Sequence, residues 1–80
     1  MEPSDIKAII ESAITDSQAT VQSDGRHVDV VVVSPAFAGL SLLKKQQLVN
    51  AALKSAIADG RIHAVQMKTY TPEEWSELQG

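Results

Sequence analysis

A valine-rich stretch from His27 to Val33 is the feature that most limits how this chain can fold. β-Branched residues favour extended structure, and near the end of this stretch valine occupies both alternating sets of positions. That pattern predicts a central strand covered by its neighbours. Asp24-Gly25, just before it, is typical of tight hairpin turns, so we expect residues 18–23 to form an antiparallel neighbour. The fold is therefore expected to be built around a sheet.

Two segments have the spacing of amphipathic helices. In residues 4–15 the apolar positions recur at i, i+3, i+4, i+7 and i+8, with Ser4 as the expected N-cap. A second helix is expected from the cap Ser41 to about Ala58, where Asp59-Gly60 ends it. The expected apolar face of this second helix consists of Leu42, Val49, Ala52, Leu53, Ala56 and Ile57.

The rest of the chain completes an alternating pattern. A third strand is expected over residues 62–70, followed by a capping box at Thr71-Pro72-Glu73-Glu74 that starts a short terminal helix. The chain is long enough for one domain, residues 1–80. The order of elements predicts an α/β (α+β) two-layer sandwich. Residues 34–61 are long enough for a parallel crossover, so the three-stranded sheet is expected to be mixed.

Composition excludes several classes of function. The chain has no cysteine, which excludes disulfides, cysteine-ligated zinc and thiol catalysis. It has no nucleophile elbow and no glycine-rich phosphate loop, so we do not expect an enzyme. It has no secretory signal and its longest apolar run, Val30–Val33, cannot span a bilayer, so a cytoplasmic protein without a membrane partner is expected. Seven basic against ten acidic residues give no general attraction to nucleic acid.

The only two histidines, His27 and His63, open the second and third predicted strands. If these strands are parallel neighbours, they start about 4.8 Å apart at one end of the sheet, and an intervening strand would double that separation. Two imidazoles can supply part of a metal site shared with another molecule, as on one iron of a Rieske cluster. From the residues alone, purely structural histidines are the favoured interpretation. Asp29 can orient His27, although a solvated carboxylate is more common there.

Lys44 and Lys45 fall in the first turns of the second helix, where free backbone N–H groups already favour an anion. With Arg26 beside the hairpin turn, they predict a site for a phosphate or a carboxylate. An ordinary pair of solvated lysines is an equally good interpretation. Phe37 is expected to fill the core under the loop, and Gly39 to allow a tight turn.

Several separated motifs resemble the BolA family, in order and spacing. They are Phe37-Ala38-Gly39-Leu40-Ser41, Lys44-Lys45-Gln46-Gln47 and Arg61-Ile62-His63-Ala64-Val65. The second of these motifs and the ending Lys68-Thr69-Tyr70-Thr71-Pro72-Glu73-Glu74-Trp75 are most similar to its IbaG branch. The resemblance covers essentially the whole chain. It departs from most members at Lys45 and Gln46, where they carry an Arg-His pair.

The resemblance implies a class II KH-like fold, αββαβ(α), in which a short turn of helix follows the long second helix. Members bind monothiol glutaredoxins and share a [2Fe-2S] cluster with them and with glutathione, in iron–sulfur trafficking or iron and stress regulation. His63 would supply one ligand and His27 a second, while the thiolates come from the partner. Lys44, Lys45 and Arg26 would contact glutathione or partner acids.

The same resemblance implies an alternative, because members are also described as DNA-binding transcriptional regulators. In that case Lys44, Lys45 and Lys54 would contact phosphates through the KH-like face. The Gly-x-x-Gly loop of KH domains is absent from this chain. Without a partner, the protein is expected to hold no cofactor and to be a monomer or a weak homodimer.

Overall fold

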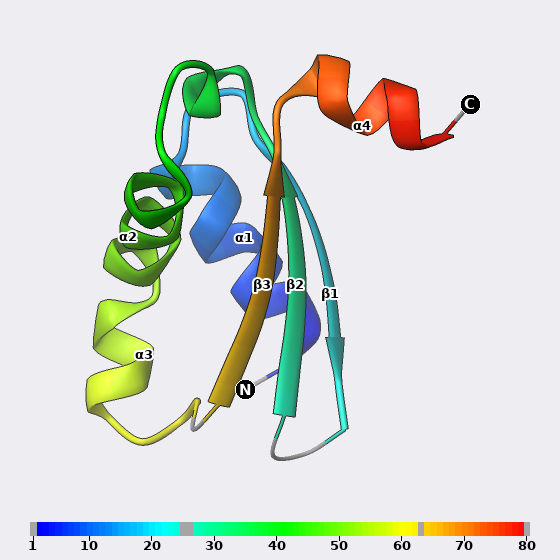
Figure 1. Cartoon of the computed structure of the whole chain (residues 1–80). Coiled ribbons are helices and arrows are strands. Elements are labelled where there is room, and N and C mark those ends of the chain that lie inside the picture. The colour runs from blue at the N-terminus through cyan, green and yellow to red at the C-terminus, as the bar shows by residue number, and fades with distance from the viewer. Residues whose placement is uncertain (1, 25–26, 63, 80) are drawn as a thin grey trace.

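The computed structural model describes residues 2–24, 27–62 and 64–79, which form a three-stranded sheet with three helices on one face (Figure 1). The elements are α1 (Pro3–Ala13), β1 (Gln18–Ser23), β2 (His27–Val33), the 3₁₀ turn η1 (Pro35–Phe37), α2 (Leu42–Ala52), α3 (Lys54–Ala58), β3 (Ala64–Tyr70) and α4 (Pro72–Gln79). This α+β order confirms the predicted fold class. Within the described ranges, no helix is long and apolar enough to cross a membrane.

The valine-rich strand β2 lies in the middle of the sheet, as predicted. It pairs antiparallel with β1 and parallel with β3. Val28, Val30 and Val32 face the helices and are almost completely buried, whereas Val31 and Val33 on the other face are half-buried. The sheet therefore has one face packed on the core and one open face, which gives the predicted two layers.

The core lies between this valine face and the helices. α1 contributes Ile6 and Ile10, and α2 contributes Val49. Phe37 in η1 is fully buried, which confirms its predicted place under the loop. Gly39 has a φ of +77°, a left-handed conformation that side chains disfavour, so the expected tight turn is also confirmed.

The first helix begins earlier than predicted, and Ser4 is not its N-cap. The N-cap is Glu2, whose backbone N–H donates to Asp5 Oδ2 at 3.1 Å, and Pro3 occupies the first helical position. A proline there is favourable because its missing N–H would have no partner in the helix anyway. Ser4 therefore lies within the first turn.

The single helix that the spacing predicts from Ser41 to Ala58 is wrong, because the segment forms two helices. The short α3 after α2 confirms the turn of helix that the family resemblance implies. Ser41 caps α2 as expected, since its Oγ accepts from the Lys44 N–H at 3.2 Å. The helix breaks at Leu53, whose φ of −97° and ψ of 5° leave the helical region. The predicted apolar face is confirmed only in part. Its buried members are Val49, Leu53 and Ala56, whereas Leu42 is 65% and Ile57 41% exposed.

The third strand starts at Ala64 rather than at Ile62. Gly60 has a φ of +76° and turns the chain back along α3, as the predicted stop signal indicates. The N–H groups of Arg61 and Ile62 both donate to the Ala56 carbonyl, at 3.0 and 3.3 Å. Ile62 is therefore buried as an anchor of this turn and not as a member of the sheet.

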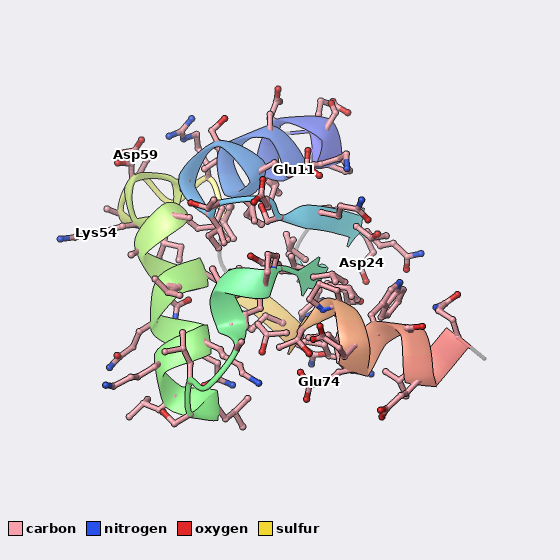
Figure 2. All side chains as sticks on the ribbon, turned by 90° about the horizontal axis from the view of Figure 1, so that it is seen from above. Glu11, Asp24, Lys54, Asp59 and Glu74 are labelled. Atoms are coloured by element: carbon pink, nitrogen blue, oxygen red, sulfur yellow. The ribbon has the colours of Figure 1, made fainter. Side chains whose placement is uncertain are left out.

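Side chains of α1 cover the outer edge of β1 at Ala19. Glu11, which points from α1 toward β1 in Figure 2, accepts from the Ala19 N–H at 2.9 Å, and Lys7 donates to the Ala19 carbonyl at 2.9 Å. Lys7 and Glu11 also form an ion pair at 2.6 Å. The hydrogen bond from Lys7, with that from Ala19, lowers the pKa of Glu11 below its ordinary value. Both backbone groups of Ala19 on this edge thus have partners.

The terminal helix α4 extends away from the end of the sheet (Figure 1). The predicted capping box is present: the Thr71 N–H donates to Glu74 Oε1 at 2.8 Å, and the Glu74 N–H donates to Thr71 Oγ1 at 3.2 Å. The rings of Tyr70 and Trp75 lie 5.4 Å apart at 46°. None of the eight residues of α4, all of them described, is buried.

Candidate functional site

His27 lies at the end of the β1–β2 hairpin with its side chain 68% exposed. Its backbone carbonyl accepts from the Asp24 N–H at 3.1 Å, and its own N–H donates to Asp24 Oδ1 at 2.9 Å. Its Nδ1 lies 3.6 Å from the same carboxylate oxygen. The backbone therefore holds the imidazole at the rim of the sheet, where another molecule can reach it.

The carboxylate beside His27 is Asp24, not Asp29. A carboxylate near Nδ1 favours the tautomer with its proton there, which leaves Nε2 with a lone pair for a ligand bond. Asp29 lies on β2 farther from the turn. The Asp-Gly dipeptide predicts a turn, and an aspartate three residues before a strand histidine also indicates this partner.

The register of the sheet fulfils the condition for the proposed pair of histidines. β2 and β3 are parallel neighbours, and His27 is paired with Ala64, the residue that follows His63 in the sequence. His63 itself lies outside the described residues, as does Arg26. Among the described residues, no group of three or more histidine, aspartate or glutamate side chains could hold a metal ion. A metal at His27 would thus need ligands beyond the described part of this chain.

The two neighbouring lysines of α2 differ in their surroundings. Lys44 is exposed. Lys45 Nζ lies 3.8 Å from Glu74 Oε1, and its side chain is only 15% exposed. The backbone N–H of Thr71 is the main cause that lowers the pKa of Glu74, so this carboxylate stays charged beside Lys45. The pair joins α2 to α4. Because Lys45 already lies beside a carboxylate of this chain, its charge is partly neutralised and attracts another anion less strongly.

The structure does not bring the lysines and His27 together. Lys45 contacts α4 just after the end of β3, whereas His27 is paired with the residue that begins β3. These positions are separated by a strand of seven residues, or about 20 Å. A small anion held at His27 cannot reach Lys45. Lys54 begins α3 and projects away from the sheet (Figure 2), so the three lysines form no common patch.

A groove beside β3 was not foreseen from the sequence. It has a volume of about 780 Å³, and Gln46 and Asn50 of α2 line it together with Met67 and Lys68 of β3. Its formation depends on how closely α2 approaches β3, which no local pattern in the sequence specifies.

Comparison with known proteins identifies the family. The family model described as BolA-like protein matches residues 1–74. The chain belongs to the BolA family. It is 43% identical over 76 residues to the acid stress protein IbaG of Escherichia coli, which covers 95% of this chain and 90% of the relative, and this places it in the IbaG branch.

Solved BolA structures agree with the fold. A BolA homologue from Coxiella burnetii matches with a TM-score of 0.83 and 36% identity, covering 95% of this chain and 97% of that one. Yeast Fra2 matches with a TM-score of 0.69 and 36% identity, covering 98% of this chain and 87% of that one. The α+β fold with a three-stranded mixed sheet is therefore that of the BolA family.

Proposed function

We propose that this BolA protein is a non-catalytic adaptor that pairs with a monothiol glutaredoxin through a shared [2Fe-2S] cluster. The observation that carries the proposal is the imidazole of His27, exposed at the rim of the sheet in a chain without cysteine. Such a protein can donate nitrogen to iron only where another molecule supplies the sulfur ligands. Membership of the BolA family supports the same assignment.

The donor atoms of the chain fit half of such a site. Asp24 beside Nδ1 leaves Nε2 of His27 free to bind, and imidazole is a known ligand of iron in [2Fe-2S] centres. His63, one residue before the register partner of His27, is proposed as the second ligand. The bound cluster would supply the electron-accepting iron, while this chain would orient its imidazoles and give the joint site its partner specificity.

Lys44 and Lys45 do not belong to this ligand site, because about 20 Å of strand separates Lys45 from His27. We assign Lys44, which is exposed, a contact to an acidic group elsewhere on the partner. The proposed biological setting is iron–sulfur trafficking or regulation by iron and stress. The name of the related acid stress protein IbaG supports a role in stress.

The test is a titration of the full chain with cluster-loaded monothiol glutaredoxin and glutathione, followed by visible absorption and circular dichroism. We expect the spectrum to change on mixing, and His27→Ala and His63→Ala each to weaken or alter that change. Asp29→Asn is the matched control, since it changes a polar residue on the same strand without removing an imidazole. A spectrum that the chain leaves unchanged, or that both histidine variants change as the wild type does, contradicts the proposal.

A further inference from the structure

The two outer edges of the sheet differ in how their backbone groups are satisfied. On β1, Glu11 and Lys7 bind the N–H and the carbonyl of Ala19, as described above. An exposed strand edge otherwise offers unpaired backbone groups to any extended chain, and proteins commonly cover such edges. Among the described residues, no side chain forms such hydrogen bonds with the outer edge of β3.

The register identifies the backbone groups on that edge. The Ser34 N–H donates to the Tyr70 carbonyl at 3.0 Å, so Tyr70 directs its backbone groups toward β2. In a parallel ladder every second residue does the same, and the residues between direct both groups outward. The outward residues are Val65, Met67 and Thr69. Within the described ranges, no hydrogen bond reaches their outward N–H and carbonyl groups.

A groove of about 780 Å³ lies next to this strand, and Val30 and Val31 of β2 line it as well as residues of β3. Its far wall is α2, where Gln46 and Asn50 are four residues apart and so lie on the same side of the helix. Each carries a primary amide that can donate and accept hydrogen bonds. A chain lying in the groove would thus have a backbone ladder on one side and two amides on the other.

We propose that the outer edge of β3 and this groove accept an extended peptide segment of a partner protein, which joins the sheet as a fourth strand. Successive side chains of that segment would point to opposite faces. One set would contact Val65 and Met67 on the helix side. The other would lie beside Gln66 and Lys68 on the open face, where an acidic residue next to Lys68 is favoured. The expected pattern therefore alternates apolar and polar residues.

Charge and geometry favour a peptide over other occupants. The groove lining contains one acid, Asp29, and one base, Lys68, so it offers no excess positive charge to a phosphate backbone. It also contains no aromatic side chain on which a base could stack. A second copy that paired antiparallel through the same edge would have to place its own α2 on the same face of the joined sheet, whereas a single extended segment brings no helix with it.

This inference goes beyond the adaptor role and does not involve the histidines. The test uses the full chain and a twelve-residue peptide selected from a random library displayed on phage. The selected peptide is titrated into ¹⁵N-labelled protein, and amide hydrogen exchange is measured residue by residue. Strand addition should slow the exchange of the Val65, Met67 and Thr69 amides by about tenfold or more at saturation. The Gln66 and Lys68 amides already bond to β2 and should change little.

Met67→Pro removes one outward N–H without touching the ladder to β2, and should weaken peptide binding by about tenfold. Val21→Pro is the matched control, because it makes the same change at an outward position of β1. The inference is overturned if no selected peptide binds better than millimolar or if the alternating protection is absent. It is also overturned if single-stranded DNA alone produces that protection, or if the protection follows protein concentration without peptide.

Discussion

Ser34 is the only buried polar residue in the part of the chain that the structure describes, and Ser34→Ala is expected to destabilise the fold by about 2 kcal/mol. Its Oγ donates to the Thr15 carbonyl at 2.8 Å and accepts from the Ala36 N–H at 3.0 Å. The hydroxyl thus ties the chain after α1 to the end of β2 and caps η1.

The expected magnitude follows from these two hydrogen bonds. Each contributes about 1 kcal/mol net, and Ser34→Ala would leave a backbone donor and a backbone acceptor without their partner in a region closed to water. For a domain of this size, about 2 kcal/mol corresponds to a fall in Tm of roughly 8–16 °C. Alanine is smaller than serine by one oxygen, so the substitution introduces no steric clash.

Urea unfolding followed by far-ultraviolet circular dichroism measures this change, with an unchanged m-value as the check that unfolding remains two-state. Ser55→Ala is the matched control, since Ser55 is exposed on α3 and alanine has the higher helix propensity. We expect the control to change the free energy of unfolding by no more than a few tenths of a kcal/mol. Equal effects at the two serines would refute the reasoning.

Three further predictions concern stability. Thr69→Val should raise the free energy of unfolding by about 1 kcal/mol, because the Thr69 Oγ1 is buried and has no partner among the described residues; a loss measured by urea unfolding would contradict this. Gly39→Ala should lower the free energy of unfolding by about 1 kcal/mol, because alanine disfavours a φ of +77°. An added Cβ meets nothing within 4 Å, so a much larger loss of stability in urea unfolding would contradict this reasoning. The pKa values of Glu11 and Glu74 are lowered in the folded protein, so the charged carboxylates stabilise the fold fully above the ordinary pKa of 4.5. This stabilisation is lost as the pH falls through the lowered pKa values of the folded state. Wild type should therefore lose stability on acidification below about pH 4.5 more steeply than Glu11→Gln, and parallel pH profiles would exclude this origin.

The strands could be predicted because their signals are local. The bounds of β1 and β2 follow from alternation and from the Asp-Gly turn, and both predictions are confirmed. The break at Leu53 could not be predicted in this way, because no glycine or proline marks it. It falls at Leu53, which is fully buried in the core, so its conformation depends on tertiary packing.

The candidate site was predictable to a similar degree. The length of the crossover allows β2 and β3 to be parallel but leaves open whether a strand lies between them. The observed register shows that they are neighbours and puts the residue after His63 opposite His27. The same topology also places the start of α2 beyond the carboxyl end of β2, away from His27. The separation of Lys44 and Lys45 from the histidine could therefore have been derived from the sequence, whereas the groove beside β3 could not.

The last helix lies outside the core of the domain. α4 shields none of the hydrophobic interior, and the family match ends at residue 74, within its first turn. Trp75 packs on Tyr70, but the exposed residues 76–79 beyond it can be substituted at little cost in folding free energy. The surface of this last stretch of helix can therefore change without disturbing the domain that carries it.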